Sequence, residues 1–148
     1  MKTEPIVKTE PIIIERLYNA TTAKVWLAIT DKDQMKEWYF DIEEFKTEPG
    51  FKFQFLAGDE KKKYLHLCKV TEVIPGKKLT YSWRYENDPN ISFVTFELSP
   101  EGEQTKLTLI HEGVEGFASD NPDFKKQNFV EGWTDIIGAS LKEFVEKQ

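Results

Sequence analysis

Hydrophobic and polar residues alternate along much of the chain, a pattern typical of β-strands with one buried face. Between residues 79 and 85 every odd-numbered residue is apolar or aromatic and every even-numbered residue is polar. Val94, Phe96 and Leu98 alternate with polar neighbours in the same way. Segments rich in Gly, Pro, Asn and Asp separate these stretches and predict tight turns. The pattern predicts seven strands, at residues 12–18, 41–47, 51–56, 64–74, 77–85, 91–99 and 105–112.

Two short helices are predicted between the first and second of these strands. Thr21 or Thr22 can cap the first helix, and Asp31 or Asp33 can cap the second, because short polar side chains accept hydrogen bonds from the first helical N–H groups. Apolar residues then recur at helical spacing: Val25, Trp26 and Ile29 in the first helix, Met35 and Trp38 in the second.

A long amphipathic helix is predicted from residue 122 or 123 to the end of the chain. Gly132 and Gly138 lie inside it, and each costs about 1 kcal/mol relative to alanine in a helix interior. Close packing of the helix on a sheet would explain both glycines. The apolar stripe comprises Phe129, Val130, Trp133, Ile136, Ile137, Leu141 and Phe144.

These elements predict an α+β fold. A seven-stranded, curved antiparallel sheet presents one apolar face, two short helices precede it, and the long C-terminal helix covers that face. At 148 residues the chain fits a single domain, residues 1–148, in which residues 1–11 form an extended segment containing two prolines. Because large rings fill both surfaces imperfectly, we expect a pocket between helix and sheet.

The order of the elements resembles the START/Bet v 1-like (SRPBCC) superfamily, the helix-grip folds. Local motifs narrow the resemblance to the Hsp90-ATPase-activator-like (AHSA1-type) family, from about residue 12 onward. They are I-E-R-L-Y-N-A at 14–20, V-W at 25–26, P-G-F-K-F at 49–53, V-T-E-V-I-P at 70–75, L-T-Y-S-W at 79–83, T-K-L-T-L-I-H-E-G at 105–113 and G-W at 132–133.

The resemblance implies a helix-grip fold, an apolar ligand in the interior or a chaperone partner, and, in the wider superfamily, cyclase or hydratase activity. The true co-chaperone carries a second domain that supplies much of its contact with Hsp90, and this sequence does not contain that domain. Phe51 and Cys68 stand where relatives often have glycine, and Thr22 replaces a frequent proline. These departures change the shape of a pocket rather than the fold.

Charge and composition exclude several partners. The formal net charge is −6 and the isoelectric point about 5.1, so we expect neither a nucleic-acid surface nor an anionic membrane as partner. The longest unbroken apolar run, residues 25–29, is too short to span a bilayer, and the N-terminus has no secretory signal. Cys68 is the only cysteine, which excludes an intramolecular disulfide and indicates a reducing, cytoplasmic environment.

The residues that could carry catalysis or hold a metal do not form a recognisable site. His111-Glu112 lacks the second histidine of a zincin motif. His66 and Cys68 share one strand face, but two ligands do not make a zinc site, and residues two apart on a strand lie about 7 Å apart. No phosphate-binding loop or carboxylate pair stands out. The sequence therefore predicts no catalytic residue, metal or cofactor, and favours a binding protein over an enzyme.

We therefore expect a non-enzymatic protein that binds a small, largely apolar ligand between the sheet and the C-terminal helix. His111 would either anchor the ligand through its imidazole or hydrogen-bond within the fold and close the sheet. Oligomeric state and ligand identity are open. The candidate ligand-binding residues are Trp38, Phe53, Phe55, Tyr64, His66, Tyr81, Trp83, Phe96, Leu109, His111, Trp133 and Ile137.

Overall fold

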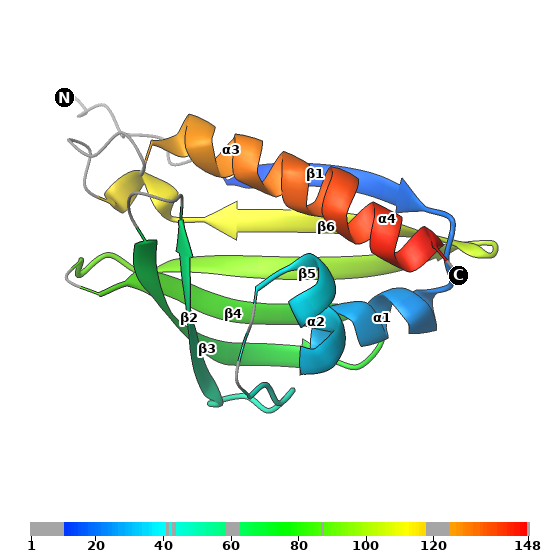
Figure 1. Ribbon diagram of the computed structural model, residues 1–148, viewed down its shortest axis with the longest axis horizontal. Coiled ribbons are helices and arrows are strands. Elements are labelled where there is room, and N and C mark those ends of the chain that lie inside the picture. The colour runs from blue at the N-terminus through cyan, green and yellow to red at the C-terminus, as the bar shows by residue number, and fades with distance from the viewer. Residues whose placement is uncertain are drawn as a thin grey trace, which may run out of the picture.

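The computed structural model describes residues 11–40, 42, 44–58, 63–86, 88–117 and 125–147. Its six strands form one antiparallel sheet in the order β1-β6-β5-β4-β3-β2 (Figure 1). Apart from Pro11, the predicted extended segment at the N-terminus lies outside the described residues. The strands are β1 (Ile12–Tyr18), β2 (Lys52–Gly58), β3 (Lys63–Ile74), β4 (Lys78–Tyr85), β5 (Ser92–Glu101) and β6 (Gln104–Glu112).

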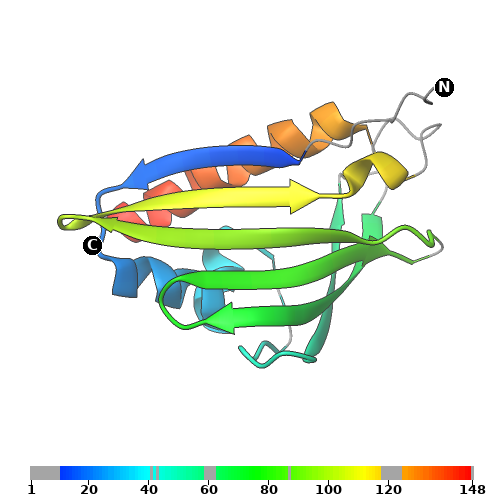
Figure 2. The same cartoon turned by 180° about the vertical axis from the view of Figure 1, so that it is seen from behind.

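The α-helices of the described residues lie on one side of this sheet. The C-terminal helix runs along β1 and β6 on that side, and α1 (Thr22–Thr30) and α2 (Lys32–Trp38) lie beside its C-terminal part (Figure 1). When the molecule is turned around, the strands lie in front of the helices (Figure 2). The sheet therefore has an inner face, which the helices cover, and an outer face on the opposite side. We use these two names throughout.

The alternation correctly predicts which residues point inward. Leu79, Tyr81, Trp83 and Tyr85 of β4 are all buried, and the alternating apolar residues of β5 are buried opposite them. The six strands that form agree with the predicted ranges to within two residues at each end. Burial of an apolar face of this size by the helices is the main driving force for the fold.

One of the seven predicted strands, at residues 41–47, is wrong. Its described residues form no strand, and the sheet has six strands. Among the described residues of this segment Ile42 and Phe45 are buried, and a spacing of three does not match the period of two that a strand requires. Phe45 instead packs edge-on against Phe53 of β2, with ring centroids 5.0 Å apart. The segment therefore contributes to the core as an irregular connection.

Both predicted helix caps are present. The side chain of Thr21 accepts a hydrogen bond from the backbone N–H of Lys24, and that of Asp31 accepts one from Gln34. These bonds satisfy donors that the first turn of a helix leaves unpaired, and they fix where α1 and α2 begin.

The C-terminal helix is a continuous run of α3 (Lys126–Asp135), the π-helical turn η3 (Ile136–Ser140) and α4 (Leu141–Glu146). The predicted start at residue 122 or 123 lies outside the described residues. The Tyr18 hydroxyl donates to the carbonyl of Ile137 at 2.6 Å, and the Ser140 hydroxyl donates to the carbonyl of Trp38 at 2.7 Å. These bonds attach the π-helical turn to β1 and α2.

The two helix glycines differ. At Gly138 an added Cβ would lie 3.2 Å from Nε of Arg16 on β1, so close packing is confirmed there. At Gly132 nothing lies within 4 Å of such an atom, so the packing explanation is wrong for that residue. Among the described residues, no helix is long and apolar enough to cross a membrane.

Candidate functional site

The structure brings all twelve predicted site residues together on the inner side of the molecule. Eleven are buried and Tyr64 is half-buried. Phe53 and Phe55 come from β2, Tyr64 and His66 from β3, Tyr81 and Trp83 from β4, Phe96 from β5, Leu109 and His111 from β6, Trp38 from α2, Trp133 from α3 and Ile137 from η3.

His66 lies at the centre of one group of rings. Its imidazole stacks on Phe55 with centroids 4.6 Å apart and meets Trp83 edge-on at 4.9 Å. Tyr85 approaches it at 4.7 Å. The ring nitrogen Nδ1 lies 2.9 Å from the carbonyl of Tyr64, which assigns the proton to Nδ1 as donor. Burial lowers the pKa of His66 to about 4 despite hydrogen bonds from the ring to backbone carbonyls, so the ring is neutral at physiological pH.

His111 lies in a chain of hydrogen bonds that joins four elements, α3, β6, β5 and β4. Trp133 on α3 donates its indole N–H to Nδ1 of His111 at 3.0 Å. Nε2 therefore carries the proton and donates to the Ser92 hydroxyl at 2.9 Å, and this hydroxyl donates to the carbonyl of Trp83 at 2.7 Å. Both imidazole nitrogens are thus satisfied inside the protein. This geometry favours the structural alternative for His111 over the ligand anchor.

Burial also lowers the pKa of His111, to about 3. A protonated ring would carry hydrogens on both nitrogens and could no longer accept from the Trp133 indole. The hydrogen-bond chain therefore requires the neutral ring, which the buried environment enforces.

Trp83 is the exception among these hydrogen-bonded groups. Its indole N–H is buried and has no hydrogen-bond partner. Burial raises the pKa of Tyr85, and the nearby Trp83 indole offsets part of this rise. The indole N–H and the Tyr85 hydroxyl nevertheless do not reach hydrogen-bond geometry. An unpaired buried donor costs about 1–3 kcal/mol.

Tyr39 and Ser92 are site residues that the sequence predictions missed. The Tyr39 hydroxyl lies 2.6 Å from that of Tyr81, and the Tyr39 ring stacks with Trp38 and with Trp133. Tyr39 follows the end of α2, where no periodic pattern marks it. Ser92 could have been found, because alternation places it on the same strand face as Val94. Ser92 differs from the predicted residues, which are aromatic, aliphatic or histidine.

The interior carries no activated nucleophile at Cys68. Burial raises the pKa of the Cys68 thiol, so it is protonated at neutral pH and a poor nucleophile. Within the described ranges, no group of three or more His, Cys, Asp or Glu residues could hold a metal ion. His66 and Cys68 do share the inner face of β3, as the alternation predicts.

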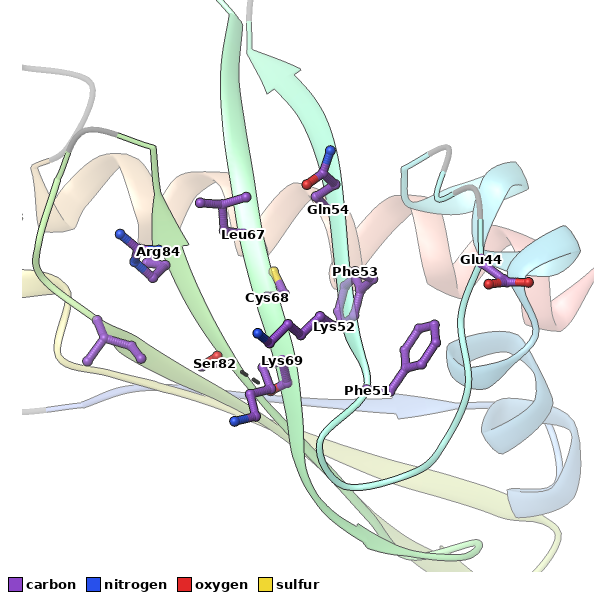
Figure 3. A pocket seen from close by; sticks show the side chains of 11 residues that line it. Glu44, Phe51, Lys52, Phe53, Gln54, Leu67, Cys68, Lys69, Ser82 and Arg84 are labelled. Carbon is purple, nitrogen blue, oxygen red and sulfur yellow. Dashed lines mark hydrogen bonds between the residues drawn. The ribbon is translucent and has the colours of Figure 1, made fainter.

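One groove among the described residues lies mainly on the other side of the sheet from this ring cluster, although Phe53 and Cys68 of the inner face also line it. It has a volume of about 590 Å³ and includes outward-facing residues of β2, β3 and β4 (Figure 3). Between the sheet and the C-terminal helix, the rings named above are in contact with one another. The predicted inner pocket therefore stays a prediction.

Comparison with known proteins places this geometry in a family. The family model of the Activator of Hsp90 ATPase homolog 1-like proteins matches residues 19–146. The chain belongs to this family. The match covers both short helices, β2 to β6 and the C-terminal helix, and it confirms the resemblance drawn from the sequence motifs.

Relatives of this Activator of Hsp90 ATPase homolog 1-like chain include curated and solved proteins. The mouse Activator of 90 kDa heat shock protein ATPase homolog 2 is 26% identical over 129 residues, which cover 84% of this chain but only 37% of the mouse protein. The chain thus spans little more than a third of that relative.

Solved structures extend over nearly the whole chain. Protein MLL2253 from Mesorhizobium loti has a TM-score of 0.76 at 25% identity, covering 94% of this chain and 98% of its own. CalU16 from Micromonospora echinospora has a TM-score of 0.70 at 27% identity, covering 97% and 79%. These likenesses support the helix-grip fold.

Proposed function

We propose that the protein binds a small, largely apolar molecule between the sheet and the C-terminal helix and does not transform it. One observation carries this proposal: the Trp83 indole N–H is buried without a partner, while the neighbouring His111 is fully hydrogen-bonded. Buried polar groups normally have partners, and an exception calls for an explanation. A ligand with a hydrogen-bond acceptor would supply the missing partner.

The surroundings of Trp83 define the chemistry of such a ligand. The indole has His66, His111 and Trp133 as ring neighbours, with centroids at 4.9, 5.3 and 5.5 Å. Rings favour an apolar body, whose burial contributes about 25 cal/mol per Å². A carbonyl or ether oxygen on that body would accept from the Trp83 N–H, close to the Tyr85 hydroxyl. The predicted ligand is therefore a neutral aromatic or aliphatic molecule with one acceptor, and a side-chain shift would admit it.

The protonation states support binding without turnover. General acid–base catalysis works best with a group whose pKa lies near the operating pH. The pKa values of His66 and His111 are lowered to about 4 and 3, and that of the Cys68 thiol is raised. The cyclase or hydratase alternative would need one of the histidines as a base. Turnover of a polyketide-like substrate that is lost in His66→Gln or His111→Gln would establish it.

The test uses two probes of nearly equal shape, 2-acetylnaphthalene and 2-ethylnaphthalene, of which only the first has an acceptor oxygen. Quenching of tryptophan fluorescence measures each affinity. We expect the wild-type protein to bind the acetyl probe about fivefold to tenfold more tightly, as one hydrogen bond contributes about 1 kcal/mol. Trp83→Phe should abolish this difference while keeping a ring at the site. Equal affinities for both probes in the wild-type protein would contradict the proposal.

A second candidate function is supported by the curated relative. The mouse protein is named as an activator of the 90 kDa heat shock protein ATPase, and its similarity to this chain covers 84% of the chain. A pull-down with Hsp90 and an ATPase assay discriminate between the two functions. Robust stimulation of the ATPase would favour a chaperone-associated role over the binding of a small molecule. Native mass spectrometry of protein purified from its own host would reveal a bound mass directly.

A further inference from the structure

The outer face of the sheet carries an unusual cluster of positive charge. Lys52 on β2 and Lys69 on β3 are directly opposite each other in the strand register, and Arg84 follows on β4 beside Leu67. These three cations line the groove of about 590 Å³ together with one carboxylate, Glu44. Figure 3 shows the two lysine side chains beside β3, with their amino groups on the same side of it.

Like charges directly opposite each other on neighbouring strands destabilise a sheet. Neither lysine, nor Arg84, forms an ion pair or a side-chain hydrogen bond with the described residues, whereas Lys78, Lys126 and Lys142 all have carboxylate partners. The protein as a whole has a net charge of −6. The local excess of positive charge is therefore not a general property of the surface, and no described carboxylate forms an ion pair with these three cations.

The groove also has an apolar part. Leu67 and the exposed Ile91 line it beside the cations. Its floor is Ser82, whose register partners are Lys69 on one side and Phe93 on the other. Ser82 is buried, and its hydroxyl donates to the carbonyl of Lys69 at 3.4 Å. A short side chain between two long ones leaves a hollow, and its volume falls in the range typical of sites for small molecules.

We propose that this groove binds an organic carboxylate with an apolar body, independently of the ligand inside the fold. The half-buried Arg84 guanidinium offers a planar pair of donors that matches a carboxylate. Lys52 and Lys69 add charge on the same side, and the bound anion removes their mutual repulsion. Leu67 and Ile91 cover the apolar body of the ligand.

Decanoate and decan-1-ol are the probes, since they share a chain and differ in charge. Calorimetric titration in 50 mM salt gives the affinities, and amide chemical shifts locate the site. We expect decanoate to bind at least about tenfold more tightly than decanol, and Arg84→Gln to weaken decanoate by about tenfold or more. The shifted signals should belong to residues 67–69 and 82–84. Lys106→Gln, on the outer face of β6, is the matched control and should change the affinity less than twofold.

The like-charge pair provides a second readout. Lys69→Gln should weaken decanoate binding and at the same time raise the melting temperature of the free protein by about 1–3 °C, because the repulsion with Lys52 is removed. A lysine with only a structural role would lower the melting temperature when replaced.

Three results would overturn this proposal. They are equal binding of decanoate and decanol, equal weakening by Lys106→Gln and Arg84→Gln, and loss of decanoate binding in Trp83→Phe but not in Arg84→Gln. The last result would place the anion in the interior and leave the inner site standing. Conversely, the wild-type protein and Trp83→Phe could show the same preference between the two naphthalene probes. That result would contradict the inner site only and would leave the proposal for the outer groove standing.

Discussion

The two faces of the sheet contrast most sharply on β4. Its inward residues Leu79, Tyr81 and Trp83 are buried among rings, and the hydrogen-bond chain through His111 ends on the carbonyl of Trp83. On the outer face of the same strand, Ser82 and Arg84 border a groove whose cations form no ion pair with the residues that the structure describes. Alternation along a single strand therefore separates a buried ring cluster from a groove that gathers positive charge.

This contrast indicates which kinds of residue in such a fold are evidence for ligand binding. Rings on the inner face bury area and are explained by packing alone, so each of them is weak evidence for binding. A polar or charged group that has no favourable partner in the protein is stronger evidence for a ligand, because leaving it without one costs free energy. Each face has one such feature: the Trp83 N–H inside, and the opposed Lys52 and Lys69 outside. The predictions below test whether the two faces differ in this way.

The largest effect should come from removing the inner cover. A chain that ends at Gly132 loses Trp133, Ile137, Leu141 and Val145, all of which are buried. Each such side chain contributes about 1.5–3 kcal/mol, against a total stability of about 5–15 kcal/mol. We expect no cooperative thermal transition by circular dichroism. Ending the chain at Glu146 instead should preserve the transition, and a sharp melt of the shorter chain would refute the architecture.

A matched pair of substitutions compares the two faces directly. Trp83→Ala should lower the free energy of unfolding by about 3–5 kcal/mol, as expected for large-to-small changes in a core. Leu67→Ala, on the outer face of β3, should cost less than about 1 kcal/mol because Leu67 is only half-buried there. Urea titration measures both values. A loss below 1 kcal/mol for Trp83→Ala would mean that the inner face contributes little to stability.

Acid should destabilise the inner face through its two histidines. Their pKa values are lowered by burial to about 4 for His66 and about 3 for His111, below the value near 6.5 of an unfolded chain. The unfolded state therefore binds more protons between those values, and stability falls as the pH drops through 6.5. From pH 7 to pH 5 each histidine should cost about 2 kcal/mol.

Urea titrations at the two pH values test this expectation. His111→Gln should remove about half of the pH dependence and lower stability at pH 7, because glutamine cannot reproduce both bonds of the imidazole. A wild-type protein equally stable at pH 7 and pH 5 would show that neither histidine is held neutral. Unchanged stability at pH 7, combined with weaker ligand binding, would restore the anchor role of His111.

Local patterns in the sequence determine much of this structure. Alternation identifies the inward residues of β4 and β5, and Thr21 and Asp31 fix the starts of two helices, because both signals depend only on neighbours along the chain. The segment 41–47 was wrongly predicted because the turn residues at 48–50 follow it as they would follow a strand, whereas its buried residues Ile42 and Phe45 are three positions apart. The reason for that spacing is long-range packing, such as the contact of Phe45 with Phe53 of β2, which forms only in the folded chain.

The site itself depends on long-range geometry. The bonds from Trp133 to His111 and from His111 to Ser92 join residues that are 22 and 19 positions apart, through the register of β5 and β6 and the placement of α3. The opposition of Lys52 and Lys69 likewise follows from strand pairing. No periodic signal in the sequence encodes these pairings, so the sequence yields the candidate residues but not their partners.

The smallest expected effect on stability comes from replacing the two glycines of the C-terminal helix. Gly132 has open space around the position of a Cβ atom, whereas at Gly138 that atom would lie 3.2 Å from Arg16 Nε. Gly132→Ala should raise the free energy of unfolding by up to about 1 kcal/mol, because alanine restricts the unfolded chain and favours the helix. Gly138→Ala should gain less or lose stability, since the Arg16 side chain must move. Chemical denaturation of both variants checks the difference, and equal gains would show that the Arg16 contact does not constrain the π-helical turn.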